Sequence, residues 1–302
     1  MDLHGNSFLN CDSLINQRLN QIKEFKENSS WLEDEVKCDL ICETVSFLDG
    51  SSLNHLFILT PFILRLIDDH QHENKLKGLN CLNNIITRYG LCDLESANFH
   101  QLFWSNLKKL LYNNDGDVVK SLIPLLVYFI EKFSLGQGEI DQCFDQLIKN
   151  QLISSDKTLF LININGILQF IKKWPKELVK FSKKILEMTL TLIEDQIISS
   201  TTYQLIVSSI EVLELIISRN GKLSYLYAGQ ILITFIKFKF NLIDKKNNLD
   251  GNQTNNLNMK IESCLLELKT NNPKLLAYYC DLLKKRSTCD DSLLRLTFGN
   301  LF

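Results

Sequence analysis

The fold is decided by residues 57–88, which read FILTPFILRLIDDHQHENKLKGLNCLNNIITR. Two apolar segments lie on either side of a short polar turn. Thr60 and Pro61 can start a helix, with the threonine as the cap and the proline at the first position. Asp68 and Asp69 end that helix or begin the turn. The stretch therefore predicts two helices joined by a few polar residues.

The same pattern continues outward along the chain. Glycine-, asparagine- and serine-containing breaks leave apolar segments of roughly 12–20 residues, which pair into units of about 40 residues. The predicted pairs are 52–69 with 72–89, 97–113 with 117–133, 139–152 with 156–173, and 175–196 with 200–219. A single helix pair cannot bury its apolar face, whereas stacked pairs can. We therefore predict an all-α fold, an α-solenoid of stacked antiparallel helix pairs.

The predicted organisation has two parts. Residues 1–50 form N-terminal helices, which can act as a capping unit, and residues 51–302 form the repeats. Within the first part, Ser30 to Glu33 resemble a capping box that opens a helix. Residues 244–258, DKKNNLDGNQTNNLN, are polar and Asn-rich, which predicts a loop. A calcium-binding loop is excluded there because Lys246 and Leu257 would occupy its first and twelfth positions.

Composition excludes several classes of protein. The chain has 302 residues, of which 45% are hydrophobic, which is too many for a disordered chain. Lys and Arg total 33 against 35 Asp and Glu, so the overall basic excess typical of nucleic-acid binding is missing. No apolar stretch approaches the roughly 18–20 residues that span a bilayer. With no signal-peptide pattern and an odd number of cysteines, nine, we expect reduced thiols and a cytoplasmic location, with the nucleus left open.

The sequence carries no recognisable catalytic or metal-binding motif. The sequence contains no Walker loop, GxSxG elbow or HExxH motif. Cys38 and Cys42 share a predicted helix, but no second ligand pair accompanies them, which favours core cysteines over zinc ligands. His70 and His72 stand in a polar turn and are interpreted as surface residues. We expect no enzymatic activity, no cofactor and no metal.

Two C-terminal features leave alternatives open. Lys284 to Arg286 is the densest basic cluster; a solvated helix face is favoured over a nuclear-import signal or a phosphate contact. Leu293 to Phe298 is apolar, and burial under the last repeat is favoured over a role as a docking helix.

The spacing in the deciding stretch resembles the HEAT repeat. Pro61, Asp69 and Lys75 stand eight and then six residues apart, which fits the proline, aspartate and basic residue that recur in that repeat. We expect Asp69 to accept hydrogen bonds from free amides at the start of the neighbouring pair's second helix, and the lysine to pair with such carboxylates. Gly78 is expected to let the two helices approach closely.

The stretch also resembles a narrower signature. The matching residues are Leu59, Pro61, Ile63, Leu64, Leu66, Asp68, Asp69, Lys75, Lys77, Gly78 and Leu82. The following Tyr89-Gly90-Leu91 and the Phe- and Leu-rich segment 99–111 fit the continuation. Over about residues 57–130 the chain is similar to the Tel-two-interacting protein two family, a component of the Triple-T complex.

That resemblance implies a scaffold without catalytic activity. Family members bind the first Tel-two-interacting protein, a large HEAT-repeat chain, and act with Tel-two as a co-chaperone for phosphatidylinositol-3-kinase-related kinases. If the resemblance holds, some apolar residues should stay exposed on one helical row. Two alternatives remain: another HEAT-repeat adaptor, in nuclear transport or trafficking, and a nucleic-acid-binding helical-repeat protein, which would need a basic concave face.

Overall fold

The computed structural model describes residues 5–25, 29–153, 156–195, 199, 202–243, 249–274, 277–278 and 281. Within these residues the chain is all-α and contains no strand. Contacts divide it into two compact units, residues 1–139 and 140–302. The fold class predicted from the sequence, stacked helix pairs, is confirmed.

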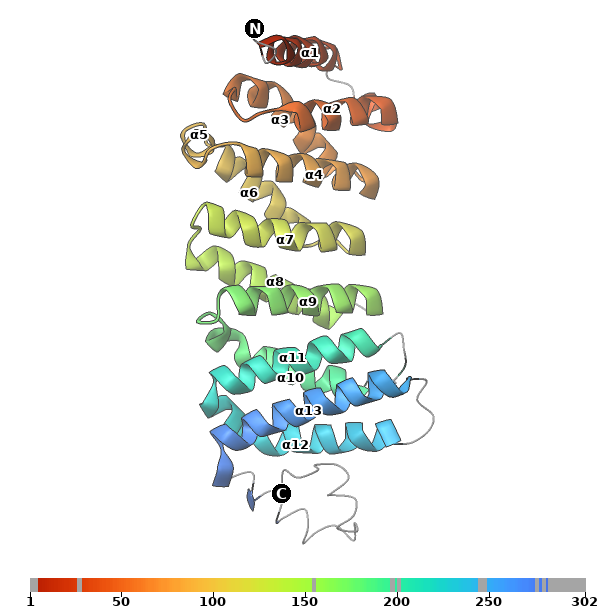
Figure 1. Cartoon of the computed structure of the whole chain (residues 1–302), viewed down its shortest axis with the longest axis vertical. Coiled ribbons are helices and arrows are strands. Elements are labelled where there is room, and N and C mark those ends of the chain that lie inside the picture. The colour runs from red at the N-terminus through yellow and green to blue at the C-terminus, as the bar shows by residue number, and fades with distance from the viewer. Residues whose placement is uncertain are drawn as a thin grey trace. The chain divides into compact units, whose positions relative to one another are not determined.

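The first unit contains three helix pairs (Figure 1). Its helices are α1 (Gly5–Lys23), α2 (Glu35–Phe47), α3 (Leu53–Asp68), α4 (His72–Arg88), α5 (Leu91–Ser96), α6 (Phe99–Leu110) and α7 (Gly116–Lys132), with a 3-10 helix, η1 (Ser29–Glu33), before α2. The pairs α1–α2, α3–α4 and α6–α7 stack in two rows. In one row α4 packs between α2 and α7, and in the other α3 packs between α1 and α6.

The second unit repeats this arrangement. Its helices are α8 (Gln137–Ile153), which begins just before the boundary, α9 (Lys157–Lys173), α10 (Leu178–Asp195), α11 (Tyr203–Arg219), α12 (Gly221–Ile243) and α13 (Gly251–Asn271). In one row α11 packs between α9 and α13, and in the other α12 packs on α10 (Figure 1). Helix α8 extends that second row, since Asp141 on α8 and Lys180 on α10 form an ion pair of 2.7 Å.

The four predicted helix pairs match α3–α4, α6–α7, α8–α9 and α10–α11 to within a few residues at each end. Periodic burial of apolar side chains explains the agreement, because every one of these helices buries an apolar face. Helix α11 is buried most completely among them, since it packs on α9, α10, α12 and α13.

The helix start predicted at Thr60 is wrong. Helix α3 begins at Leu53, so Pro61 lies in its interior. A proline there removes one hydrogen bond and disfavours the helix locally. Burial of Leu56 and Leu59 on the preceding turns, each fully inaccessible, outweighs that local preference. The Thr60 hydroxyl caps nothing; it is buried without a hydrogen-bond partner among the described residues.

The helix start predicted at Ser30 is also wrong. Residues 29–33 form the short 3-10 helix η1, and α2 begins only at Glu35. Asp34 is the N-cap of α2, and its side chain accepts a hydrogen bond from the Lys37 amide at 3.4 Å. An aspartate next to the helix is as good a cap as serine, so the local sequence offered two competing starts.

The loop predicted at 244–258 is helical over much of its length. Helix α13 begins at Gly251, while residues 244–248 lie outside the described part. The Asp250 side chain accepts from the Gln253 amide at 2.7 Å, and the Gln253 side chain accepts from the Asp250 amide at 3.2 Å. This capping box, with Leu257 and Ile261 buried one and two turns later, starts a helix that composition alone did not indicate.

Other sequence features stay predictions. The separate capping role of residues 1–50 is one of them. The basic cluster Lys284 to Arg286 and the apolar segment Leu293 to Phe298 lie outside the described residues. Among the helices that are described, none has both the length and the apolar character needed to cross a membrane.

Candidate functional site

The signature residues gather on one helix pair. Pro61 lies inside α3, Asp68 is its last residue and Asp69 is its C-cap. Lys75, Lys77 and Gly78 follow in the first two turns of α4. The turn between the helices contains only Asp69, His70 and Gln71, so the signature surrounds one tight connection.

Asp69 fastens this turn to the start of α4. Its buried carboxylate accepts from the His70 amide at 2.7 Å and from the Asn74 side-chain amide at 2.6 Å. Burial raises the pKa of Asp69, but hydrogen bonds from Asn74 and His70 outweigh burial and hold that pKa below its usual value. Asn74 also donates to the Leu32 carbonyl at 2.9 Å, which ties the turn to η1.

The prediction that Asp69 bonds to the second helix of a neighbouring pair is therefore wrong. Among the described residues, its carboxylate accepts from the turn and from the first turn of its own α4, and not from the second helix of a neighbouring pair. Contact with the preceding pair runs instead through the Asn74 side chain.

The ion pair expected of Lys75 is wrong, because Lys77 forms it instead. Its amine lies 2.7 Å from Asp39 and 4.0 Å from Glu35, both on α2. Burial lowers the pKa of Lys77. The hydrogen bond to Asp39 and the nearby negative charges of Asp39 and Glu35 together outweigh burial and hold that pKa above its usual value. Lys75 forms no ion pair in the described part of the chain. Lys77 thus joins the α3–α4 pair to the preceding pair.

Gly78 marks a close approach of α3 and α4. A Cβ atom built on Gly78 would lie 2.7 Å from Ile67 Cγ1, 2.9 Å from the Ile67 amide nitrogen and 3.2 Å from Leu66 Cβ. Because one of these atoms is backbone, the neighbour cannot move aside cheaply. The site requires a residue without a side chain.

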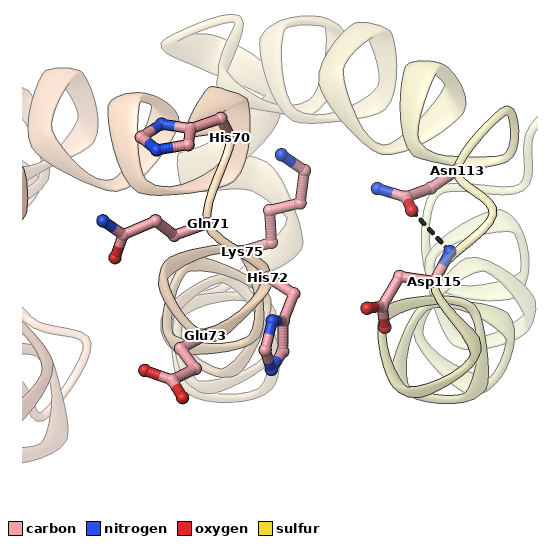
Figure 2. A pocket seen from close by; sticks show the side chains of 7 residues that line it. All are labelled: His70, Gln71, His72, Glu73, Lys75, Asn113 and Asp115. Atoms are coloured by element: carbon pink, nitrogen blue, oxygen red, sulfur yellow. Dashed lines mark hydrogen bonds between the residues drawn. The ribbon is translucent and has the colours of Figure 1, made fainter.

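A polar hollow of about 450 Å³ opens beside this turn (Figure 2). It is lined by His70, Gln71, His72, Glu73, Lys75, Asn113 and Asp115. The Asp115 carboxylate already caps α7, because it accepts hydrogen bonds from the amides of Asp117 and Val118 at 3.0 Å. The hollow mixes both signs of charge. The described residues contain no group of three or more His, Cys, Asp or Glu placed to hold a metal ion.

The cysteines singled out by the sequence are core residues. Cys38 is fully buried and its thiol contacts the carbonyls of Trp31 and Leu32 at 3.7 Å. Burial raises the pKa of Cys38 to about 11, which keeps it protonated near neutral pH. Cys42 lies 3.5 Å from Cys81, sulfur to sulfur, in a contact between α2 and α4. This arrangement supplies two thiols for packing, without the four ligands of a structural zinc site.

A separate exposed apolar row lies on α12, in the second unit. Leu226, Ile233 and Phe240 stand seven residues apart and are 72%, 47% and 41% exposed. The seven-residue spacing places them on one side of the helix. The seven-residue spacing is visible in the sequence, but by itself it does not distinguish an open face from a covered one. The expectation of exposed apolar residues on one helical row is met by these three.

The stacked pairs place the chain in the class of α-solenoids. Within that class, the model of the Tti2 family matches residues 13–113, a range that includes every signature residue. The resemblance drawn from residues 57–130 is thereby confirmed over most of its length.

Two solved structures are similar to the chain, and the fold is shared with the first. The first is a chain from the complex in which Kap95p binding induces the switch loops of RanGDP to adopt the GTP-bound conformation; the TM-score is 0.59 at 9% identity. That match covers 94% of this chain and 34% of the other, so this chain spans about a third of its length. An engineered protein gives a TM-score of 0.46 at 14% identity, over 93% of this chain and 66% of the other. No curated protein sequence matches the chain.

Proposed function

We propose that the chain is a non-catalytic scaffold subunit of a Triple-T-like co-chaperone complex. The observation that carries the proposal is the Tti2 family match over residues 13–113, on a stack of helix pairs. Signature residues in that range make structural contacts. Asp69 fastens a turn, Lys77 bridges two helix pairs and Gly78 permits close packing.

The partners follow from the family resemblance. They are a large HEAT-repeat Tel-two-interacting protein one and Tel-two, and the clients are phosphatidylinositol-3-kinase-related kinases, whose maturation and stability the complex supports. We propose a cytoplasmic location, with nuclear localisation left open. The exposed row on α12 supports an interaction role, because covering exposed apolar side chains with a partner lowers the free energy of the complex.

The charge distribution disfavours the nucleic-acid alternative. Four lysines of the second unit are paired with carboxylates on neighbouring helices: Lys180 with Asp141, Lys184 with Asp145, Lys237 with Glu194 and Lys260 with Glu211. Such interspersed pairs do not form the basic face that phosphates require. The likeness to a chain from a nuclear-import complex, at 9% identity, concerns the fold alone.

Depletion tests this function. The chain is removed from its own cells by induced degradation, and newly synthesised kinases of this class are followed by pulse labelling. We expect their amounts to fall over successive hours, to recover when the chain is restored, and unrelated kinases to stay constant. Unchanged amounts of all these kinases after complete removal would contradict the proposal.

A further inference from the structure

A second hollow, lined by four apolar and four polar or charged side chains, lies within the second unit, between α8, α9 and α10. Its volume is about 390 Å³, within the range of about 300–1,000 Å³ typical of ligand pockets. Leu152 from α8, Phe160 from α9, and Met188 and Leu192 from α10 supply the apolar half of the lining. The other half is polar or charged and consists of Gln151, Lys184, Glu187 and Thr191. None of these residues lies in the range that the family model matches.

Gln151 gives this hollow a polar contact point. The residue lines the hollow and is only 3% exposed, yet neither its side-chain oxygen nor its nitrogen has a hydrogen-bond partner among the described residues. Burying an amide unpaired is unfavourable, so such a group is expected to meet a ligand or water. The carboxamide offers one acceptor and an N–H donor, which is the pair that a peptide group complements.

The surface beside the hollow is apolar. Leu152 is 67% exposed and Ile153, the last residue of α8, is 82% exposed. A small molecule confined to the hollow would leave Ile153 in water. A polypeptide segment can fill the hollow with one side chain and cover the adjoining residues with the next.

We propose that this hollow binds an apolar peptide segment of a protein partner. A leucine-, methionine- or phenylalanine-sized side chain enters among Leu152, Phe160, Met188 and Leu192, while a backbone peptide group of the segment exchanges hydrogen bonds with Gln151. The inference rests on the proposed function in one respect, that the chain acts by binding other proteins.

Cross-linking in the intact complex tests this placement. A photo-reactive amino acid replaces Leu152 in the full chain, expressed in its own cells, and the cross-linked peptide is sequenced; the same substitution at Leu266, exposed on α13, is the control. We expect the probe at position 152 to capture one segment of another protein with a large apolar residue. Cross-links only within the chain, or none, would overturn the proposal.

Two variants then test the role of Gln151. A synthetic peptide with the captured sequence is titrated against the full-length wild type, Gln151→Leu and Gln146→Leu, whose amide already donates to Asn150 at 2.7 Å. We expect Gln151→Leu to weaken binding at least about tenfold. Its melting temperature should be unchanged or higher, because an unpaired buried amide is removed, so lost folding cannot imitate the result. Equal affinity of wild type and Gln151→Leu would overturn the role assigned to Gln151.

The two proposals fail separately. Capture of a Gln151-dependent segment from a protein outside the Triple-T complex would retain the pocket and remove the proposed function. Recovery of the Triple-T proteins without any cross-link from position 152 would retain the function and remove the pocket.

Discussion

At the residue scale, helix α4 comes closest to α3 at Gly78, where a side chain would meet both a backbone nitrogen and a buried isoleucine. The glycine was expected from the sequence to permit this approach. The partners of its neighbours could not be assigned in the same way. Lys75 and Lys77 are two positions apart, so they point to different sides of α4, and only the packed structure shows that α2 lies on the side of Lys77.

Replacing Gly78 with alanine should destabilise the chain. The added Cβ would stand 2.7 Å from Ile67 Cγ1 and 2.9 Å from the Ile67 amide nitrogen, and we expect a loss of about 1–3 kcal/mol in the free energy of unfolding. Gly138→Ala on α8 is the matched control, because nothing lies within 4 Å of its Cβ position. Urea denaturation compares them. Equal stabilities of the two variants would contradict the close approach.

Asp69 should contribute stability that depends on pH. The pKa of Asp69 is lower in the folded chain than its usual value of 3.8. Its contribution is therefore present above the unfolded-state pKa and is lost as the pH falls through the lower folded-state pKa. We expect Asp69→Asn to be less stable than the wild type by about 1 kcal/mol at pH 7, and the difference to shrink below about pH 4.

Thermal melting at a series of pH values measures this difference. Asp68→Asn, which removes the same charge from the exposed neighbouring residue, is the control. A stability difference for Asp69→Asn that persists unchanged into acid would contradict the role given to its carboxylate.

At the element scale, apolar periodicity was enough to place four helix pairs, because each helix has one buried face. Helix starts were less predictable. Local sequence favoured Ser30 and Thr60, whereas the helices begin at Glu35 and Leu53. Burial of residues on the flanking turns decides between competing caps, and the extent of that burial depends on which helices become neighbours.

The first turn of α13 should depend on Asp250. Replacing Asp250 with alanine removes the acceptor for the Gln253 amide, and we expect a loss of about 1 kcal/mol and faster hydrogen exchange at that amide. Asn255→Ala, at an exposed position later in α13, is the control and should leave exchange at the Gln253 amide unchanged. Wild-type exchange in Asp250→Ala would mean that burial of Leu257 and Ile261 alone starts the helix.

At the scale of the whole molecule, the family match lies within the first unit, whereas the exposed row on α12 lies in the second. The sequence signature could therefore indicate the family without indicating this surface. The signature records packing inside a helix pair. An open face is defined by the absence of a neighbour, which periodicity in one helix does not reveal.

A charge placed on the α12 row should disrupt partner binding while leaving the fold intact. Ile233 is 47% exposed, so Ile233→Asp should change the melting temperature little and should reduce co-purification of the large helical-repeat partner severalfold. Asn255→Asp puts the same charge on an exposed position of α13 and should have no effect on either measurement. Undiminished recovery of the partner with Ile233→Asp would remove this row from the interface.

The central claim is that the chain is a Triple-T scaffold subunit, and purification of the tagged full-length chain from its own cells tests it most directly. Co-eluting proteins are identified and quantified by mass spectrometry. We predict a large HEAT-repeat protein in near-equal amount, with Tel-two and phosphatidylinositol-3-kinase-related kinases in smaller amounts. Recovery of transport factors or trafficking coats in their place, or of no stable partner, would contradict the claim.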